Sequence, residues 1–501
     1  MPVVYSDLKP PWPITGLMLL LGSLTAAAGS GSSWADLRAW TSEGPDGPET
    51  VQAAFVDIDR TRVSIAVEGE STARALPISR LAPEDRAALT QFWKDQLAPF
   101  WVLDPPAGLP EQGISVNPQV RVVREDRDRR LFVYETQHFR FEADDQLSTS
   151  LVHDCSRAFE ITYELFIRLP LGLRPSPPEG GRYRVRLFRD RKDYVAIGKA
   201  PPNTAGVYTF DDRTNKVPFD SLGLVREGDK WRMDPKHYDT HTLIHETTHQ
   251  LMHDWGQIIP LWVAEGLAEA VACIPYRTGI LLVGDWRKGV SAHLDSSLFN
   301  AVSAAALEVM EEIALAPSPQ RHPLFSQMEQ MRALWEGQPP PAAELSRTFG
   351  ITLADPAELL IMSHQRFMSQ GLDTPPFARN TTRFQPIQQI PASFHYLTSL
   401  VIAYHLLTQD GTQGPRRFRA YLMRLQLLYQ ESVQWQETPD AKILTDAPEV
   451  IKKLRAIDLE REHPYSRLAL PVLLRNQSMD AFRTRVSGSS GLPLGRRAAR
   501  E

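Results

Sequence analysis

The sequence predicts an α+β fold, in which a small β-barrel-like module precedes a core of mixed sheet and helices and a helical C-terminal subdomain. Segments with strict alternation of apolar and polar residues, such as Tyr183–Leu187, predict strands with one wet face in the first half of the chain. Helix-like patterns dominate from about residue 300 to 476. Strands therefore come before helices, which is the order typical of α+β proteins.

The first module extends from Trp34 to Trp93. Val51–Phe55 and Val63–Val67 alternate as strands do, and Pro83 followed by two acidic residues predicts the start of a helix. A proline-rich and then charged stretch follows as a linker or an excursion at the edge of the core, and the core begins with a strand at Leu131–Tyr134. The predicted units are a signal peptide (1–28), the β-module (34–93), a linker (94–130), the core (131–300), a helical subdomain (301–476) and a disordered tail (477–501).

Composition limits the classes of function. Of the 501 residues, 42% are hydrophobic and 23% are charged, as in a globular protein, and the net charge of −5 argues against nucleic acid as a partner. The two cysteines, Cys155 and Cys273, exclude a disulfide framework and a cysteine-rich metal site, but leave open one disulfide or two buried thiols.

The N-terminal segment predicts export. Ile14 to Ala28 is apolar, ends in three alanines and is shorter than the roughly 20 residues that a membrane-spanning helix needs. We therefore expect a periplasmic or extracellular protein that begins near Gly29 and has no transmembrane domain after cleavage. An uncleaved N-terminal anchor is the alternative.

The most informative motif is His245-Glu246-x-x-His249, on a helix that Asp239 or Thr240 would cap. Two histidines four positions apart lie on the same helical face and can bind one metal ion. Glu246 stands beside them, where it can accept a proton from a water molecule.

A second helix is predicted after Pro260, and it carries Glu265 and Glu269. Residues 250–264 form the 15-residue connection between His249 and Glu265. Two histidines and one glutamate bind zinc and leave its fourth position to water. Glu269, one turn later, can accept the remaining N–H of a ligating histidine. We predict one zinc ion.

The two helices together, His245–His249 and Pro260–Ala268, resemble the gluzincin branch of the MA clan of metallopeptidases, and are most similar to uncharacterised bacterial peptidase-MA-like families. The resemblance extends from about Phe139 to Tyr429. It implies hydrolysis of a peptide or protein substrate. The roles it implies are zinc ligands His245, His249 and Glu265, general base Glu246, supporting acid Glu269, and a substrate-pairing edge strand from Ala205 through Gly206, Val207 and Tyr208 to Thr209.

Gluzincins also supply a downstream side chain that stabilises the oxyanion. Tyr396 is the candidate by resemblance, with His395 as the alternate. The sequence fits equally well a tyrosine that packs in the core with its hydroxyl hydrogen-bonded. His241 and His253 extend the four-residue ladder of the metal helix and are expected to support ligands. Trp255 stands where a metzincin has its third histidine, which excludes that class. No Gly-x-Met-Glu-Asn motif occurs, so an aminopeptidase is not indicated.

The N-terminal module has a resemblance of its own. It resembles the Sla-type homology domain, an SH3-like domain of endocytic adaptors. The segments that carry the resemblance are Leu37–Ser42, Ala53–Val56 and Leu76–Leu81, followed by Glu84 and Asp85. The resemblance implies a protein partner or a spacer role. The chief alternative to an enzyme is therefore a non-catalytic envelope adaptor with a structural metal site, and a latent enzyme is a third reading.

Overall fold

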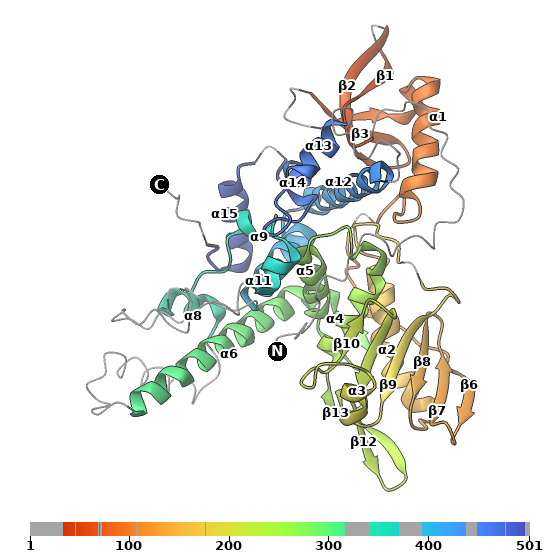
Figure 1. The fold of residues 1–501 in the computed structure, drawn as a ribbon, viewed down its shortest axis with the longest axis vertical. Coiled ribbons are helices and arrows are strands. Elements are labelled where there is room, and N and C mark those ends of the chain that lie inside the picture. Colours follow the sequence, from red (N-terminus) through yellow and green to blue (C-terminus); the bar gives the residue numbers. More distant parts are fainter. Residues whose placement is uncertain are drawn as a thin grey trace.

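The computed structural model describes residues 34–315, 340–369, 393–436 and 448–495, apart from residues 46, 69, 71, 72, 107, 176, 350 and 476. Its mixture of helices and sheets confirms the predicted α+β class (Figure 1). The predicted signal peptide lies outside the described residues. None of the described helices is both long enough and apolar enough to cross a membrane.

The N-terminal module is an antiparallel sheet in the order β1-β2-β3-β4, followed by helix α1. Trp40 and Phe55 are buried in its core, and the Trp34 ring stacks on Phe92 of α1 at 3.9 Å between centroids. No closed barrel forms among the described residues, so the SH3-like assignment stays a prediction. The elements are β1 (Arg38–Gly44), β2 (Gly47–Ile58), β3 (Arg62–Val67), β4 (Arg74–Pro77), η1 (Ile78–Arg80), α1 (Pro83–Phe92) and the π-helical turn η2 (Trp93–Leu97).

The central sheet has six strands in the order β10-β11-β9-β8-β7-β6, which leaves β10 and β6 at its edges. Strand β9 is parallel to both of its neighbours, and the remaining pairs are antiparallel. β6 lies inside the expected linker, so the sheet begins before residue 131. The elements are β6 (Arg121–Asp126), β7 (Leu131–Glu135), β8 (Phe139–Ala143), α2 (Thr149–Phe166), β9 (Tyr183–Phe188), α3 (Arg191–Ala196), β10 (Val207–Thr209) and β11 (Thr214–Pro218).

Two small sheets and a group of helices complete the core. The small sheets are the hairpin β12 (Leu222–Glu227)-β13 (Lys230–Tyr238) and the sheet β14 (Tyr276–Arg277)-β15 (Ile280–Leu281)-β5 (Ile114–Ser115). The helices and helical turns that follow the first small hairpin are α4 (Thr240–Leu251), η4 (His253–Trp255), α5 (Leu261–Ala272), η5 (Val283–Asp285) and α6 (Trp286–Leu315), and η3 (Phe219–Ser221) precedes it. α6 runs across the domain boundary expected at residue 300.

Helix α11 (Ser393–Tyr404) packs closely along α5. A Cβ atom at Gly266 would lie 2.5 Å from the carbonyl oxygen of Ser399, so only glycine allows this approach. The other helices and helical turns of the C-terminal part, up to residue 474, are α8 (Ala342–Phe349), α9 (Pro356–Leu359), α10 (His364–Ser369), η7 (His405–Gln409), α12 (Gln413–Gln436), α13 (Glu449–Arg455) and α14 (Ser466–Leu474).

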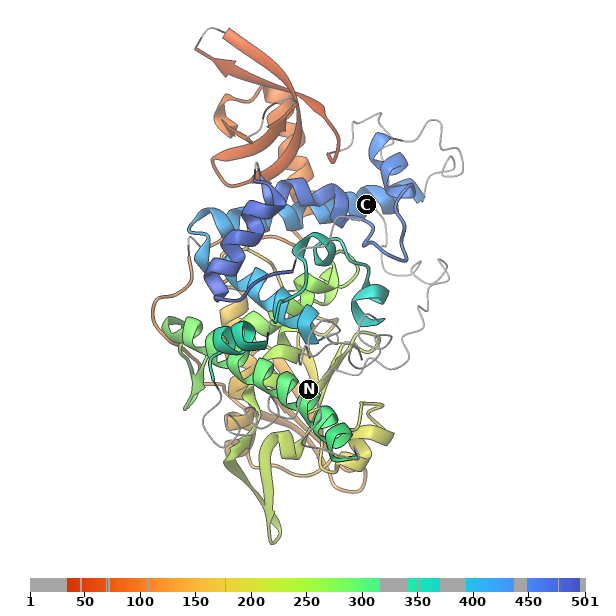
Figure 2. The same ribbon diagram turned by 90° about the vertical axis from the view of Figure 1, so that its left-hand side faces the viewer.

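The N-terminal module lies against the C-terminal helices, at the opposite end of the molecule from the central sheet (Figures 1 and 2). Arg419 of α12 is 2% exposed and donates hydrogen bonds to the Asp57 carboxylate and to the carbonyl oxygens of Val102 and Leu171. The module is therefore fastened to α12 through a buried charge, since an unpaired guanidinium there would be costly.

The expectation that residues 477–501 are disordered is wrong for Met479–Ser490, which forms helix α15. Phe482 and Val486 are fully buried, and Arg483 forms an ion pair with Asp355 at 2.7 Å. The arginine-rich composition suggested a solvated tail, but two apolar residues at helical spacing are enough to dock this helix.

Candidate metal centre

The two predicted histidine ligands meet the predicted glutamate at the junction of α4 and α5. Asp239 caps α4 by accepting a hydrogen bond from the Thr242 amide at 3.1 Å, which starts the helix so that His245 and His249 share one face. Their Nε2 atoms are 3.0 Å apart, and each lies 3.4 Å from Oε2 of Glu265. His245, His249 and Glu265 therefore form a buried group that could hold a metal ion.

The environment of Glu265 fits a cation. This residue is 1% exposed, and neither carboxylate oxygen accepts a well-formed hydrogen bond from the described residues. The pKa of Glu265 is nevertheless held at about 2, because His249 and His245 outweigh the burial that would raise it. A buried carboxylate without hydrogen bonds is costly unless a positive charge lies against it. A metal ion between the three side chains would supply that charge.

Glu269 lies beside His245, and its supporting role stays a prediction. Its Oε1 lies 3.4 Å from Nδ1 of His245, which directs Nε2 of the same ring toward Glu265. Burial alone would lower the pKa of His245, but Glu269, Glu265 and Glu246 together raise it to about 9. Three carboxylates therefore act on His245, a negative environment that favours a divalent cation.

Glu246 is buried beside this group and reaches the edge of the central sheet. Burial raises the pKa of its carboxyl group, while His245 and His249 lower it. The backbone amide of Tyr208 on β10 donates a hydrogen bond to Glu246 Oε2 at 2.7 Å. The carboxylate of the predicted base is thus fixed in orientation by the edge strand.

The predicted substrate strand is shorter than expected. Val207–Thr209 forms β10 at the edge of the sheet, whereas Ala205 and Gly206 precede the strand. The Tyr208 hydroxyl lies 2.6 Å from Nδ1 of His253, so this histidine contacts the edge strand. Among the described residues, His253 does not belong to either group that could hold a metal ion. Burial lowers the pKa of His253 to about 4, which keeps it neutral at pH 7.

The two candidates for oxyanion stabilisation lie at the start of α11, next to α10. The Tyr396 hydroxyl is 3.9 Å from Sδ of Met368, and its ring packs edge-on against Phe367. Nδ1 of His395 lies 3.0 Å from the Phe367 carbonyl oxygen, so its ring is already engaged in the local structure. The catalytic role of either residue stays a prediction.

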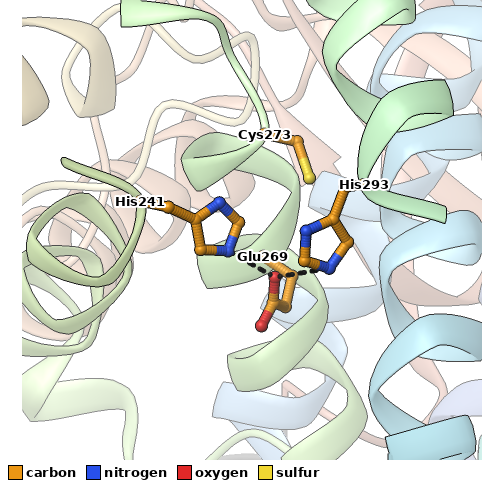
Figure 3. Close-up of side chains that lie close together, drawn as sticks. All are labelled: His241, Glu269, Cys273 and His293. Atoms are coloured by element: carbon orange, nitrogen blue, oxygen red, sulfur yellow. Dashed lines mark hydrogen bonds and ion pairs between the residues drawn. The ribbon is translucent and has the colours of Figure 1, made fainter. Parts of the chain in front are cut away.

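Sequence reasoning missed three residues in this region. The side chain of His364 on α10 is exposed to solvent but lies near enough to Glu265 for that carboxylate to act on it: the surrounding protein lowers the pKa of His364, and the charge of Glu265 acts to raise it. His293 on α6 and Cys273 at the end of α5 gather with His241 and Glu269 in a second group that could hold a metal ion (Figure 3). No motif marks His293, since it lies in a different helix, 20 residues after Cys273.

The two cysteines are not bonded to each other. Cys155 and Cys273 are both buried and both free, so the two thiols do not form a disulfide. Cys155 lies within α2, whereas Cys273 ends α5.

Comparison of the chain with protein families, with curated proteins and with solved structures gives no match.

Proposed function

We propose that this chain is an exported zinc-dependent metallopeptidase of the gluzincin type, with His245, His249 and Glu265 as zinc ligands. The observation that carries the proposal is the position of Glu246, a buried carboxylate that adjoins the ligand group and accepts a hydrogen bond from the edge strand β10. A purely structural metal site does not require a carboxylate at that place. Zinc is the expected ion because two imidazoles and one carboxylate are a common ligand set for catalytic zinc.

Zinc bound there would supply Lewis acidity to the attacking water and to the scissile carbonyl group. Glu246 would accept the proton of that water and deliver it to the leaving amine, a task helped by the burial that raises its pKa. Glu269 would keep the His245 ring in the orientation that presents Nε2. Tyr396 would donate a hydrogen bond from its hydroxyl group to the developing oxyanion.

The position of β10 favours an extended peptide as substrate. An edge strand offers unpaired backbone groups to another chain. The Tyr208 amide is directed at Glu246 rather than at β11, so a peptide lying along this edge would pass beside the base. Together with the absence of an amine-anchoring motif from the sequence, this favours cleavage within chains.

The proposal is tested by incubating the zinc-loaded protein with a peptide library derived from a proteome and identifying the products by mass spectrometry. Internal cleavage that a chelator abolishes is expected, and Glu246→Gln should remove it. Full zinc occupancy without any cleavage would favour the adaptor with a structural metal site. Removal of single N-terminal residues alone would keep the peptidase but overturn the preference for internal bonds.

A further inference from the structure

A second set of ligand-type side chains lies directly behind the candidate catalytic group. His241 belongs to the first turns of α4, Glu269 and Cys273 belong to α5 and its end, and His293 comes from α6 (Figure 3). One ligand atom from each of the four residues lies within 4.8 Å of every other. Two nitrogens, one oxygen and one sulfur therefore converge from three helices.

Both imidazoles are directed at the same oxygen atom. Nε2 of His241 lies 3.1 Å and Nε2 of His293 lies 3.5 Å from Oε2 of Glu269, and the two rings are stacked at 4.8 Å with an angle of 9°. The other oxygen of Glu269 faces His245 at 3.4 Å. Glu269 thus has one oxygen for the catalytic group and one for the second group.

The approach of α6 to α5 is built for this meeting. A Cβ atom at Gly289 would lie 1.8 Å from the Cys273 carbonyl oxygen, so any other residue would push the two helices apart. His293 is four residues, or about one turn, further along α6 and lies on the same face as Gly289. The glycine therefore lets α6 deliver His293 to the Cys273 side of α5.

Hydrogen bonds alone explain part of this arrangement but not all of it. His241 and His293 could both serve to orient Glu269, as in many supports of metal ligands. That network does not require a thiol. Cys273 nevertheless lies one turn after Glu269 on the same face of α5, and its side chain is buried, with 5% exposed. A set of two imidazoles, one thiolate and one carboxylate is complete for tetrahedral zinc.

We propose that His241, Glu269, Cys273 and His293 bind a second divalent metal ion of the zinc type, in a closed structural site that joins α4, α5 and α6. Zinc bonds of about 2.0–2.3 Å place tetrahedral ligands about 3.3–3.7 Å apart, so ligand atoms that lie within 4.8 Å of one another need to move by no more than about 1 Å on binding. Cys273 releases its proton to solvent when the metal binds. The ion differs from the one in the proposed function, and failure of either proposal leaves the other standing.

Cobalt is the probe that separates the two sites, because only the second contains sulfur. The full-length protein, stripped of metal and titrated with Co²⁺, should bind about two equivalents. It should also develop a near-ultraviolet charge-transfer band from thiolate to cobalt. Cys273→Ser should remove the band and about one equivalent. Cys155→Ser, which changes the only other cysteine, should keep both, and His249→Ala should keep the band.

Several outcomes would overturn the proposal. One is binding of a single equivalent without a thiolate band in the unaltered protein, which would leave His241, Glu269 and His293 as a hydrogen-bonded support. Another is a band that survives Cys273→Ser. Should circular dichroism show that Cys273→Ser does not fold, His293→Gln replaces it. That variant keeps both thiols but must weaken cobalt binding and alter the band, and an unchanged spectrum would equally refute the site.

Discussion

Glu269→Gln is the substitution whose effect can be worked out most fully from the structure. The glutamine keeps the shape of the side chain, but its amide can present an acceptor either to His245 Nδ1 or to the pair His241 and His293, not to both. One of the two faces of this residue therefore meets an N–H₂ group where an acceptor is required. Loss of such a support costs about 10- to 100-fold in metal affinity, or roughly 1.4–2.7 kcal/mol.

The assay is competition for zinc against a chelator of known affinity, followed by peptide turnover at limiting and at saturating zinc. At the site of His245, His249 and Glu265, Glu269→Gln should weaken zinc binding about 10- to 100-fold and lower turnover at limiting zinc. Glu164→Gln is the matched control, because Glu164 lies on α2 and forms an ion pair only with Arg168 among the described residues. Zinc affinity within twofold of the unaltered protein would refute the role given to Glu269.

Three further predictions concern the oxyanion donor, the C-terminal helices and the N-terminal module. Tyr396→Phe should spare zinc and lower turnover about 100-fold; normal turnover in Tyr396→Phe, with loss in His364→Asn, would instead make His364 the donor. Burial lowers the pKa of His405 to about 4, and its Nδ1 lies 2.6 Å from Ser489 Oγ of α15. The unfolded chain therefore protonates His405 at a higher pH than the folded protein does. This histidine contributes up to about 3 kcal/mol of stability, which is fully present above pH ~6.5 and is lost as the pH falls to about 4. The protection factors of the α15 amides, which correct hydrogen exchange for its intrinsic pH dependence, should fall over that window, and an equal fall in His405→Gln would contradict the assignment. Arg419→Met should lower the free energy of unfolding in urea by about 3–5 kcal/mol. The control Arg416→Met, at an exposed position of the same helix, should change it little. A loss below about 1 kcal/mol in Arg419→Met would show that the buried ion pair with Asp57 is dispensable.

The parts of the site that lie on regular local patterns could be predicted from the sequence. Histidines four apart on a capped helix had to share a face, and Glu265 followed a proline that starts the next helix. The junction of α4 and α5 brings the Nε2 atoms of the two histidines and Oε2 of Glu265 within 3.4 Å of one another. Local periodicity carries this information, because each residue's direction is set within its own helix.

The second group of ligands could not be predicted, because it depends on packing between distant helices. His293 reaches Glu269 only because Gly289 allows α6 to approach α5. A single glycine in a helical pattern does not indicate which helix packs against it. The same limit explains α15. Its arginines suggested solvation, whereas Phe482 is buried next to His405, which precedes it by 77 residues.

The central claim separates the residues that hold the metal from the residue that moves the proton, and one measurement tests it most directly. Zinc content and peptide turnover are determined for the unaltered protein, Glu246→Gln and Glu265→Ala. Glu246→Gln should retain the zinc content of the unaltered protein while turnover falls roughly 100-fold or more, and Glu265→Ala should lose about one equivalent of zinc together with turnover. Loss of zinc in Glu246→Gln, with metal and activity both retained in Glu265→Ala, would contradict the account.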